Sequence, residues 1–317
     1  MAFKEETISN INQLVDRLSV FCKDVLKWNS VQNRTFRPLA NSDSFQIFDV
    51  QSNIPVRVNN EQKFTASKLS TKIVGDTFHS RCDMITGFNR VWFCGDNTNV
   101  FVVIEVETGN FRWFGFGITK PIGTQQKGVS WNVAQCWYDS SDSYSQSPYS
   151  MRNFKMLDEI SSFFGSSATH YKDVRNNIAN RIKFKNKFYS DVGDTNLFGG
   201  GYRSIPYCKF INTPDIALTN SRVIGKCPLY ILPNANAKFS IISEMPLWYA
   251  VSIKNIPVPS EITFGGKKYM VFSIGGRYFE SRTNNEIDTD SINASKNNFG
   301  MMIRPRTGNA GFALLME

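Results

Sequence analysis

The sequence predicts a mainly β fold of antiparallel hairpins, sandwich-like or barrel-like, with an N-terminal α-helix and a helical, basic insertion, and so α+β overall. Strand-like apolar runs with short turns between them recur along the chain, most clearly over residues 88–118. A segment near the N-terminus has the three- and four-residue apolar spacing of a helix. A polar stretch, a second helical pattern and a basic run then interrupt the β pattern over residues 139–204.

The length of 317 residues fits one large domain or two modest ones. We expect a helix and a β-rich part over 1–138, an insertion lobe over 139–204, and a β-rich part over 205–317 that packs with the first part as one core. Hydrophobic residues make up 41% of the chain and 26 residues are Phe, so a sizeable core can form and bulk disorder is not expected.

The N-terminal helix is predicted from a single apolar face and should end near Trp28. Glu5 and Glu6 are expected at its N-terminal end, where the helix dipole favours negative charge, and Lys23 and Lys27 at its C-terminal end. The apolar face consists of Ile8, Ile11, Leu14, Val15, Leu18, Phe21, Cys22 and Val25. We expect this face to pack on a sheet or on another helix.

The strongest β signal is a hairpin over residues 100–118. Two apolar runs, residues 100–106 and 111–118, flank a short Thr-Gly-Asn turn whose Gly and Asn tolerate positive φ. Alternate residues of the second run fall on opposite faces of the strand. Gly115 and Gly117 leave one face nearly bare, which suggests close approach of another backbone or of a large side chain.

Further strands are expected on both sides of the insertion. Gly265 and Gly266 should form the two-residue turn of a hairpin between residues 261–264 and 267–272. The other strand-like runs are residues 45–50, 54–58, 65–74, 91–93, 228–233, 247–253, 301–304 and 312–316. A helix is predicted over residues 151–164 of the insertion, where apolar residues recur at helical spacing.

Cofactor and metal chemistry are not expected. No two of the six cysteines form a CxxC pair or a zinc-ligand cluster, and there are only two histidines. The glycine run at 199–201 has neither the spacing nor the setting of a phosphate-binding loop. The cysteines, which we expect to be reduced thiols, are Cys22, Cys82, Cys94, Cys136, Cys208 and Cys227.

Three residues could serve acid–base or nucleophilic catalysis. His79 and His170 are the two imidazoles, and neither lies in a recognisable nucleophile motif. Glu105 interrupts an apolar strand, and burial there would raise its pKa. The alternative, which we favour, is that Glu105 points outward or pairs with an arginine such as Arg112 across the hairpin. We therefore expect no enzyme activity.

The formal net charge of +9 is mostly dispersed, with one concentration. A basic run contains Lys172, Arg175, Arg181, Lys183, Lys185 and Lys187, interleaved with Tyr171, Phe184, Phe188 and Tyr189. This mixture can bind single-stranded nucleic acid by stacking and charge. A charged helix or loop that faces solvent, or an acidic neighbouring subunit, is the more ordinary interpretation and the one we favour. The run is then a candidate subunit interface.

Neither a signal peptide nor a membrane span is predicted. Residues 1–6 lead into a polar, helix-like segment, and no window approaches the roughly 18 consecutive apolar residues of a span. Synthesis in the cytoplasm is therefore expected.

A central block of sequence runs through residues 90–96, 100–106 and 109–117, ends in Phe-Gly-Phe-Gly, and is followed by Lys120 and Gly123. The helix that ends near Trp28 precedes this block, and a Gly-Gly hairpin at 261–266 follows it. Over 1–30, 88–137 and 225–317 the chain thereby resembles a family of tailed-bacteriophage virion proteins; residues 140–204 have no counterpart. The motif residues that carry the resemblance are Phe111, Trp113, Phe114, Gly115, Phe116, Gly117, Gly265 and Gly266.

The resemblance implies a structural protein of the neck or tail end of a virion, of the collar, tail-completion or tail-terminator type. Such a protein assembles in the host cytoplasm as a ring of identical subunits, with other virion proteins (tail tube, sheath, connector) as partners. It carries over no catalytic residue. A baseplate or receptor-contact module, binding a glycan or peptide near Trp137, Tyr144 and Tyr149, is the first alternative. A cell-wall hydrolase that uses Glu105 and a second acid is the other.

Overall fold

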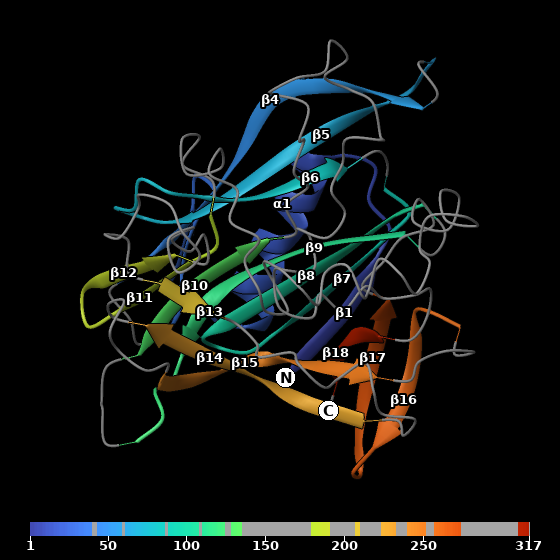
Figure 1. Ribbon diagram of the computed structural model, residues 1–317. Coiled ribbons are helices and arrows are strands. Elements are labelled where there is room, and N and C mark those ends of the chain that lie inside the picture. The colour runs from blue at the N-terminus through green and yellow to red at the C-terminus, as the bar shows by residue number, and fades with distance from the viewer. Residues whose placement is uncertain are drawn as a thin grey trace, which may run out of the picture.

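The computed structural model describes residues 1–39, 43–58, 61–85, 88–107, 110–123, 128–134, 179–190, 207–209, 223–232, 240–251, 257–273 and 310–316. This part of the chain is mostly β-strand, with one short α-helix that runs on into a π-helical turn (Figure 1). The predicted mainly β class is therefore correct. No helix in the described ranges has both the length and the apolar character needed to cross a membrane.

The strands form two hydrogen-bonded sheets, one of 13 strands and one of 5. From edge to edge the larger sheet runs through β1 (Ala2–Glu6), β7 (Arg90–Gly95), β8 (Asn99–Glu107), β9 (Asn110–Thr119), β10 (Val129–Ala134), β11 (Arg181–Phe184), β12 (Lys187–Ser190), β13 (Tyr207–Lys209), β14 (Val223–Leu232), β15 (Ser240–Val251), β18 (Ala310–Leu315), β17 (Lys267–Ser273) and β16 (Ser260–Phe264). The smaller sheet runs through β2 (Ser30–Gln32), β3 (Thr35–Arg37), β4 (Phe45–Val58), β5 (Glu61–Ile73) and β6 (Ser80–Ile85). Apart from the parallel β12–β13 pair, these pairings are antiparallel.

The larger sheet folds over so that its two parts face each other across a first hydrophobic core. The Trp92 ring on β7 lies edge-on to Phe272 on β17, with centroids 5.1 Å apart. Phe101 on β8 meets Phe312 on β18 at 6.4 Å. These contacts join residues more than 150 positions apart, so residues from the first and last thirds of the chain build this core together. Buried aromatic rings contribute a large part of the stability of such cores.

A second core lies on the opposite face of β7, β8 and β9. The helix α1 (Ile11–Val20) and the smaller sheet pack there. The Phe116 ring is its centre, with centroids 5.9 Å from Trp28, 5.4 Å from Phe36 and 5.3 Å from Phe45. The molecule thus has three layers, and the strands that carry the Phe-Gly-Phe-Gly motif lie in the middle one.

In the β8–β9 hairpin, alternate residues of β9 lie on opposite faces of the sheet, as the sequence predicts. Phe111 and Trp113 point into the first core, whereas Phe114 and Phe116 point into the second. A Cβ atom added to Gly115 would lie 2.6 Å from the Phe101 ring. Close approach of a large side chain, expected from the bare face of this strand, is therefore present.

The start of the N-terminal helix was predicted wrongly. Glu5 and Glu6 belong to the edge strand β1, where Glu5 pairs with Trp92 of β7. Helix α1 begins after Asn10, whose side-chain oxygen accepts a hydrogen bond from the Gln13 backbone N–H at 2.9 Å. An Asn cap satisfies a free N–H of the first turn directly, whereas the acidic pair offers only its charge to the helix dipole.

The predicted apolar face of the helix is buried along most of its length, through Leu14, Val15 and Leu18. The last turn, η1 (Phe21–Val25), is π-helical, so its residues advance around the axis by a smaller angle than in an α-helix. Val25 therefore leaves the buried face and is 45% exposed.

Several predicted strands are merged or moved in the structure. The runs at 45–50 and 54–58 form the single strand β4, with an irregularity in its register between Val50 and Ile54. Gly265 and Gly266, both at positive φ, form the expected two-residue turn between β16 and β17. Residues 181–190, expected in a basic lobe, are strands β11 and β12 of the larger sheet. The helix predicted over 151–164 and the strand over 301–304 lie outside the described residues.

Candidate interaction surfaces and buried polar sites

Glu105, the residue singled out for acid–base chemistry, is 1% exposed and held by two donors. Its Oε2 accepts hydrogen bonds from Arg90 Nε at 2.9 Å and from Asn89 Nδ2 at 3.1 Å. Arg90 also lies 3.6 Å from the Glu5 carboxylate and stacks over the Trp92 ring. The hydrogen bond from Arg90 to Glu105 raises the pKa of Arg90. The pair therefore links β1, β7 and β8. The expected pairing of Glu105 with an arginine is present, with Arg90 of β7 as a partner, whereas the alternative of an outward-pointing carboxylate is wrong.

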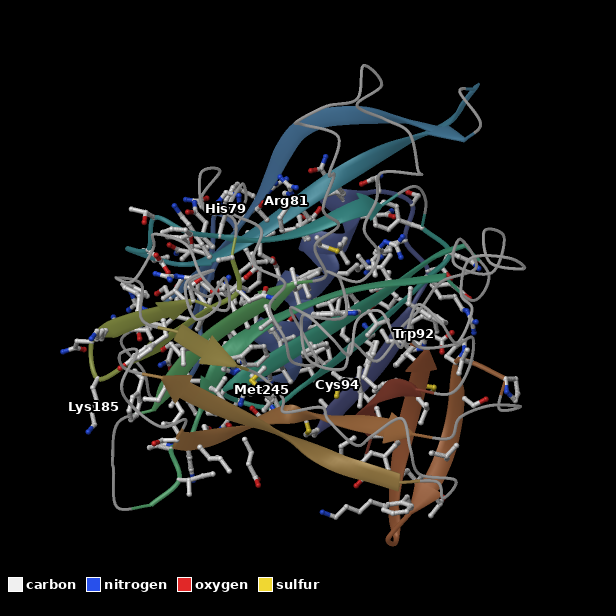
Figure 2. The ribbon with its side chains drawn as sticks, viewed as in Figure 1. His79, Arg81, Trp92, Cys94, Lys185 and Met245 are labelled. Carbon is white, nitrogen blue, oxygen red and sulfur yellow. The ribbon has the colours of Figure 1, made fainter. Side chains whose placement is uncertain are left out.

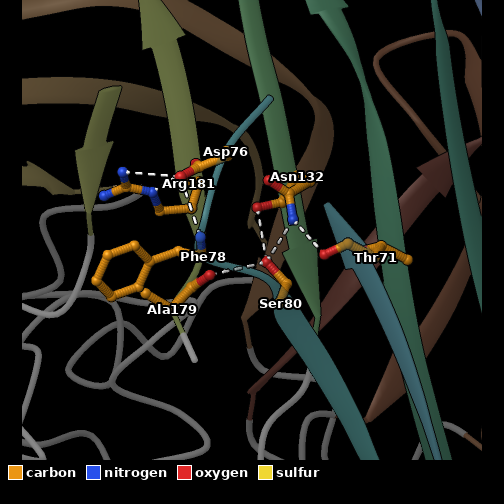
Figure 3. A network of polar contacts seen from close by, with 7 residues as sticks. All are labelled: Thr71, Asp76, Phe78, Ser80, Asn132, Ala179 and Arg181. Carbon is orange, nitrogen blue, oxygen red and sulfur yellow. Dashed lines mark hydrogen bonds and ion pairs between the residues drawn. The ribbon is translucent and has the colours of Figure 1, made fainter. Parts of the chain in front are cut away.

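A second buried ion pair lies between the two sheets. Arg181 on β11 donates from Nε to Asp76 Oδ2 at 2.8 Å and from Nη2 to Asp76 Oδ1 at 3.3 Å (Figure 3). The side chains are 7% and 3% exposed. Asp76 Oδ1 also accepts the Phe78 backbone N–H, and the Phe78 ring lies 4.6 Å from the guanidinium. A bidentate pair with these further contacts holds β11 against the segment that precedes β6.

Next to this pair is a hydrogen-bond network of uncharged groups. Asn132 Nδ2 on β10 donates to the Thr71 carbonyl at 2.9 Å and to Ser80 Oγ at 2.8 Å. Ser80 Oγ is also within 3.2 Å of the Ala179 carbonyl (Figure 3). This network joins β5 and β6 of the smaller sheet to β10 of the larger. No sequence pattern indicates this network, since isolated Asn and Ser residues in strand-like runs are common.

His79 lies in the sequence between Phe78 and Ser80, which belong to these two groups. Its ring lies edge-on to Phe48 at 5.4 Å, and its backbone carbonyl accepts the Ala179 N–H at 3.0 Å. Figure 2 shows it beside Arg81 at the smaller sheet. His170, the other imidazole, lies outside the described residues. No cluster of three metal-ligating side chains occurs in the ranges that the structure covers.

The basic run divides into buried and exposed residues. Arg181 is in the interior ion pair, and Lys183 Nζ lies 2.6 Å from Asp43 Oδ1. Lys185 and Lys187 are exposed at the tip of the β11–β12 hairpin, and Figure 2 shows Lys185 pointing away from the molecule. Arg181 is therefore not available to a partner. Lys172 and Arg175, the other two predicted interface residues, lie outside the described residues.

Two aromatic residues of this hairpin, Phe184 and Tyr189, do not offer their faces to bases, whereas Phe188 is partly buried. Phe184 is 5% exposed and Tyr189 is 6% exposed. The Lys185 ammonium lies 5.5 Å from the Phe184 ring, and the Lys187 ammonium 5.9 Å from the Tyr189 ring. The two rings thus contact the lysines by cation–π interaction. Neither ring has an exposed face on which a nucleic-acid base could stack.

Three cysteines in the described part of the chain are buried and form no disulfide: Cys22, Cys82 and Cys94. Burial raises the pKa of Cys94 to about 12 and raises the pKa of Cys22 well above its usual value. Cys94 Sγ also lies 3.3 Å from the Leu315 carbonyl. Neither thiol is suited to nucleophilic or metal-binding chemistry, because the reactive species is the thiolate.

Native protein at pH 8 is therefore expected to leave Cys22 and Cys94 unmodified by iodoacetamide, while urea-unfolded protein is modified at both. At a pKa of about 12 only about one Cys94 thiol in ten thousand is ionised at pH 8. Peptide mass spectrometry measures this, and rapid native labelling of Cys94 would contradict it. Since the unfolded thiol ionises near pH 8.5, this group also makes stability fall as pH rises from about 8.5 toward 12.

The most extended feature is the ribbon formed by β4 and β5. Among the described strands, β3 pairs with β4 only at Phe45 and Gln46, and β6 pairs with β5 only from Ser67 to Thr71. Farther out, residues 54–58 and 61–66 pair with each other alone. Figure 1 shows this end of the ribbon standing away from the helix and the larger sheet. We call residues 54–58 and 61–66 the arm.

The chain matches no model of a known protein family and no curated protein. The aromatic loop with Trp137, Tyr144 and Tyr149, the candidate glycan or peptide site, lies outside the described residues. The arm and the exposed lysines of the β11–β12 hairpin are therefore the features on which a function can be argued.

Proposed function

We propose that this protein is a non-enzymatic structural subunit of a tailed-phage virion, acting at the neck or tail end. It assembles into a ring of identical subunits and docks onto neighbouring virion proteins. The arm is the observation that carries the proposal. The resemblance of the central motif to tailed-phage virion proteins gives the virion setting.

The arm supports assembly because it has two unpaired edges among the described strands. A two-stranded ribbon is marginally stable by itself in water, and an unpaired strand edge is a template for another chain. A neighbouring subunit that pairs with the arm would stabilise the ribbon and would supply hydrogen-bond partners for its unpaired edge. An acceptor surface other than the arm makes the contact heterologous, and heterologous contacts form a ring when the rotation between subunits closes.

The buried charges also support a structural role. Glu105 and Asp76 are buried carboxylates with arginine partners, and each bridges neighbouring strands or sheets. Both are held by at least two donors and lie among packed side chains. Carboxylates fixed in this way hold neighbouring strands and layers in one arrangement, as expected of a structural subunit.

Removing the arm is expected to abolish assembly without unfolding the subunit. Ile54 is directly opposite Ala66, so an Asn-Gly turn in place of residues 55–65 joins the two strands as a two-residue hairpin. This variant keeps the β6 partners Ser67–Thr71. Light scattering should give the monomer mass for this variant and an oligomer mass for the wild type. Circular dichroism should show the same strand content per residue in the remaining chain.

The matched control shortens a different exposed hairpin. Replacing residues 263–268 with Asn-Gly joins Ile262 to Tyr269, which are directly opposite in β16 and β17. This variant should still assemble and should still join purified phage tails or heads. Assembly of the armless variant to the wild-type mass, or equal loss in both variants, would refute the role of the arm.

A further inference from the structure

Three exposed lysines from separate parts of the sequence lie along one end of the larger sheet. Thr119 on β9 pairs with Val129 on β10, and the next pair along β10 and β11 is Ser130 with Lys183. The end of β9, the start of β10 and the β11–β12 turn are therefore at the same end of the sheet. Lys120, Lys185 and Lys187 are exposed there, and we call them the lysine rim.

Within the described ranges, the positive charge of the rim has no ion-pair partner. No carboxylate of the described residues lies within ion-pair distance of Lys120, Lys185 or Lys187. The nearby acidic groups are engaged, since Asp43 binds Lys183 and Ser130, and Asp76 binds Arg181. Glu244 is exposed on β15, next to Ser243, whose hydroxyl lies 2.7 Å from the Lys120 carbonyl oxygen. The rim is thus net positive with this carboxylate counted.

The turn that presents two of these lysines has a fixed geometry. Lys185 and Asn186 have φ of 50° and 63°, the left-handed conformations of a type I′ turn between paired strands. The cation–π contacts with Phe184 and Tyr189 lie beneath the lysines. The two ammonium groups are therefore positioned before any ligand arrives.

The chemistry of the rim fits phosphate better than a protein surface. Adjacent strands lie about 4.8 Å apart, so Lys120 after β9, Lys185 after β11 and Lys187 on β12 stand along the sheet end at intervals of one or two strand spacings. Such a row of cations can follow a phosphate backbone. Lysine is depleted at protein–protein interfaces, whose energy comes mainly from buried aromatic and Arg anchors. Phe184 and Tyr189 are buried. Their rings therefore contact the lysines and are not accessible for stacking with nucleic-acid bases.

We propose that the lysine rim binds the phosphate backbone of DNA without sequence preference. The contact is electrostatic and needs neither base stacking nor base-edge hydrogen bonds. The net charge of +9 assists by attracting a polyanion over long range. The site lies within one subunit, so the proposal does not rest on ring formation. In an assembled ring the rims of successive subunits would repeat around the axis.

The test is fluorescence anisotropy of labelled DNA duplexes with the full chain, from 50 to 300 mM salt, for duplexes of two unrelated sequences. Log affinity should fall linearly with log salt, equally for both sequences. The variant K120Q/K185Q/K187Q should bind more weakly, with a slope smaller by about 0.9 per lysine removed. Each single substitution should lower the slope by about one-third of that change.

The control variant K23Q/K27Q/K267Q removes the same net charge from exposed lysines elsewhere. Its slope should stay close to that of the wild type. Equal slopes in the two triple variants would show a diffuse charge effect and overturn the site. Absence of binding by the wild type at 50 mM salt would overturn it too, as would tight binding of an acidic peptide together with weak binding of DNA. Unchanged melting temperatures verify that both variants are folded.

Discussion

Gly117→Ala is expected to prevent folding, or to lower the free energy of unfolding by more than about 4 kcal/mol. A Cβ atom there would lie 2.4 Å from the Thr98 carbonyl oxygen and 2.6 Å from Asn99 Cα. Both contacts are with backbone at the start of β8, so neither can be relieved by a side-chain rotation. The φ of +151° is also one that residues with a side chain rarely adopt. Soluble yield and urea unfolding measure the effect.

Gly265→Ala is the matched control. Gly265 also has positive φ, +57°, but a Cβ there would meet no atom within 4 Å. The left-handed conformation alone costs a non-glycine residue about 1–2 kcal/mol. Similar losses in the two variants would mean that backbone conformation, and not the contact between β8 and β9, accounts for Gly117.

Arg181→Met is expected to lower the free energy of unfolding by about 3–5 kcal/mol. It removes the partner of Asp76, whose side chain is 3% exposed, and leaves a buried carboxylate with only the Phe78 N–H as donor in this group. The double variant D76N/R181M should lose less than the sum of the two single variants, because both remove the same interaction. Urea unfolding of the four proteins in this cycle gives the coupling energy.

Lys183→Met tests whether burial of the ion pair causes the large loss of unfolding free energy expected for Arg181→Met. Lys183 forms the neighbouring ion pair on the same strand, but its side chain is 24% exposed and that of Asp43 is 17% exposed. Water can reach this pair, so its loss should cost about 1 kcal/mol. Equal losses for Lys183→Met and Arg181→Met would contradict the account of the Asp76–Arg181 pair.

The sequence was most informative where the pattern was local. The β8–β9 and β16–β17 hairpins need only a short turn and a period of two, and both are present. Gly115 marked a close approach because a strand rarely omits two side chains on one face without a packing reason. The identity of the approaching group, Phe101, follows from pairing in the same hairpin.

The sequence was least informative where the structure depends on distant partners. Arg181 and Lys183 look like parts of one basic surface, yet Asp76 and Asp43 take them inward from more than 100 positions away. Lys120 is an isolated lysine after β9 and joins Lys185 and Lys187 only through the order of strands in the sheet. Residues 2–6 become a strand because β7 offers them an open edge, which no local pattern indicates.

The molar mass of the purified full-length wild-type protein, measured by light scattering across a range of concentrations and salt, tests the central claim most directly. Self-assembly into a ring predicts one discrete oligomer, at a whole-number multiple of the monomer mass. Assembly that begins only on a neighbouring virion protein predicts a monomer that joins purified tails or heads. A strict monomer at every concentration that joins neither would contradict the proposed function.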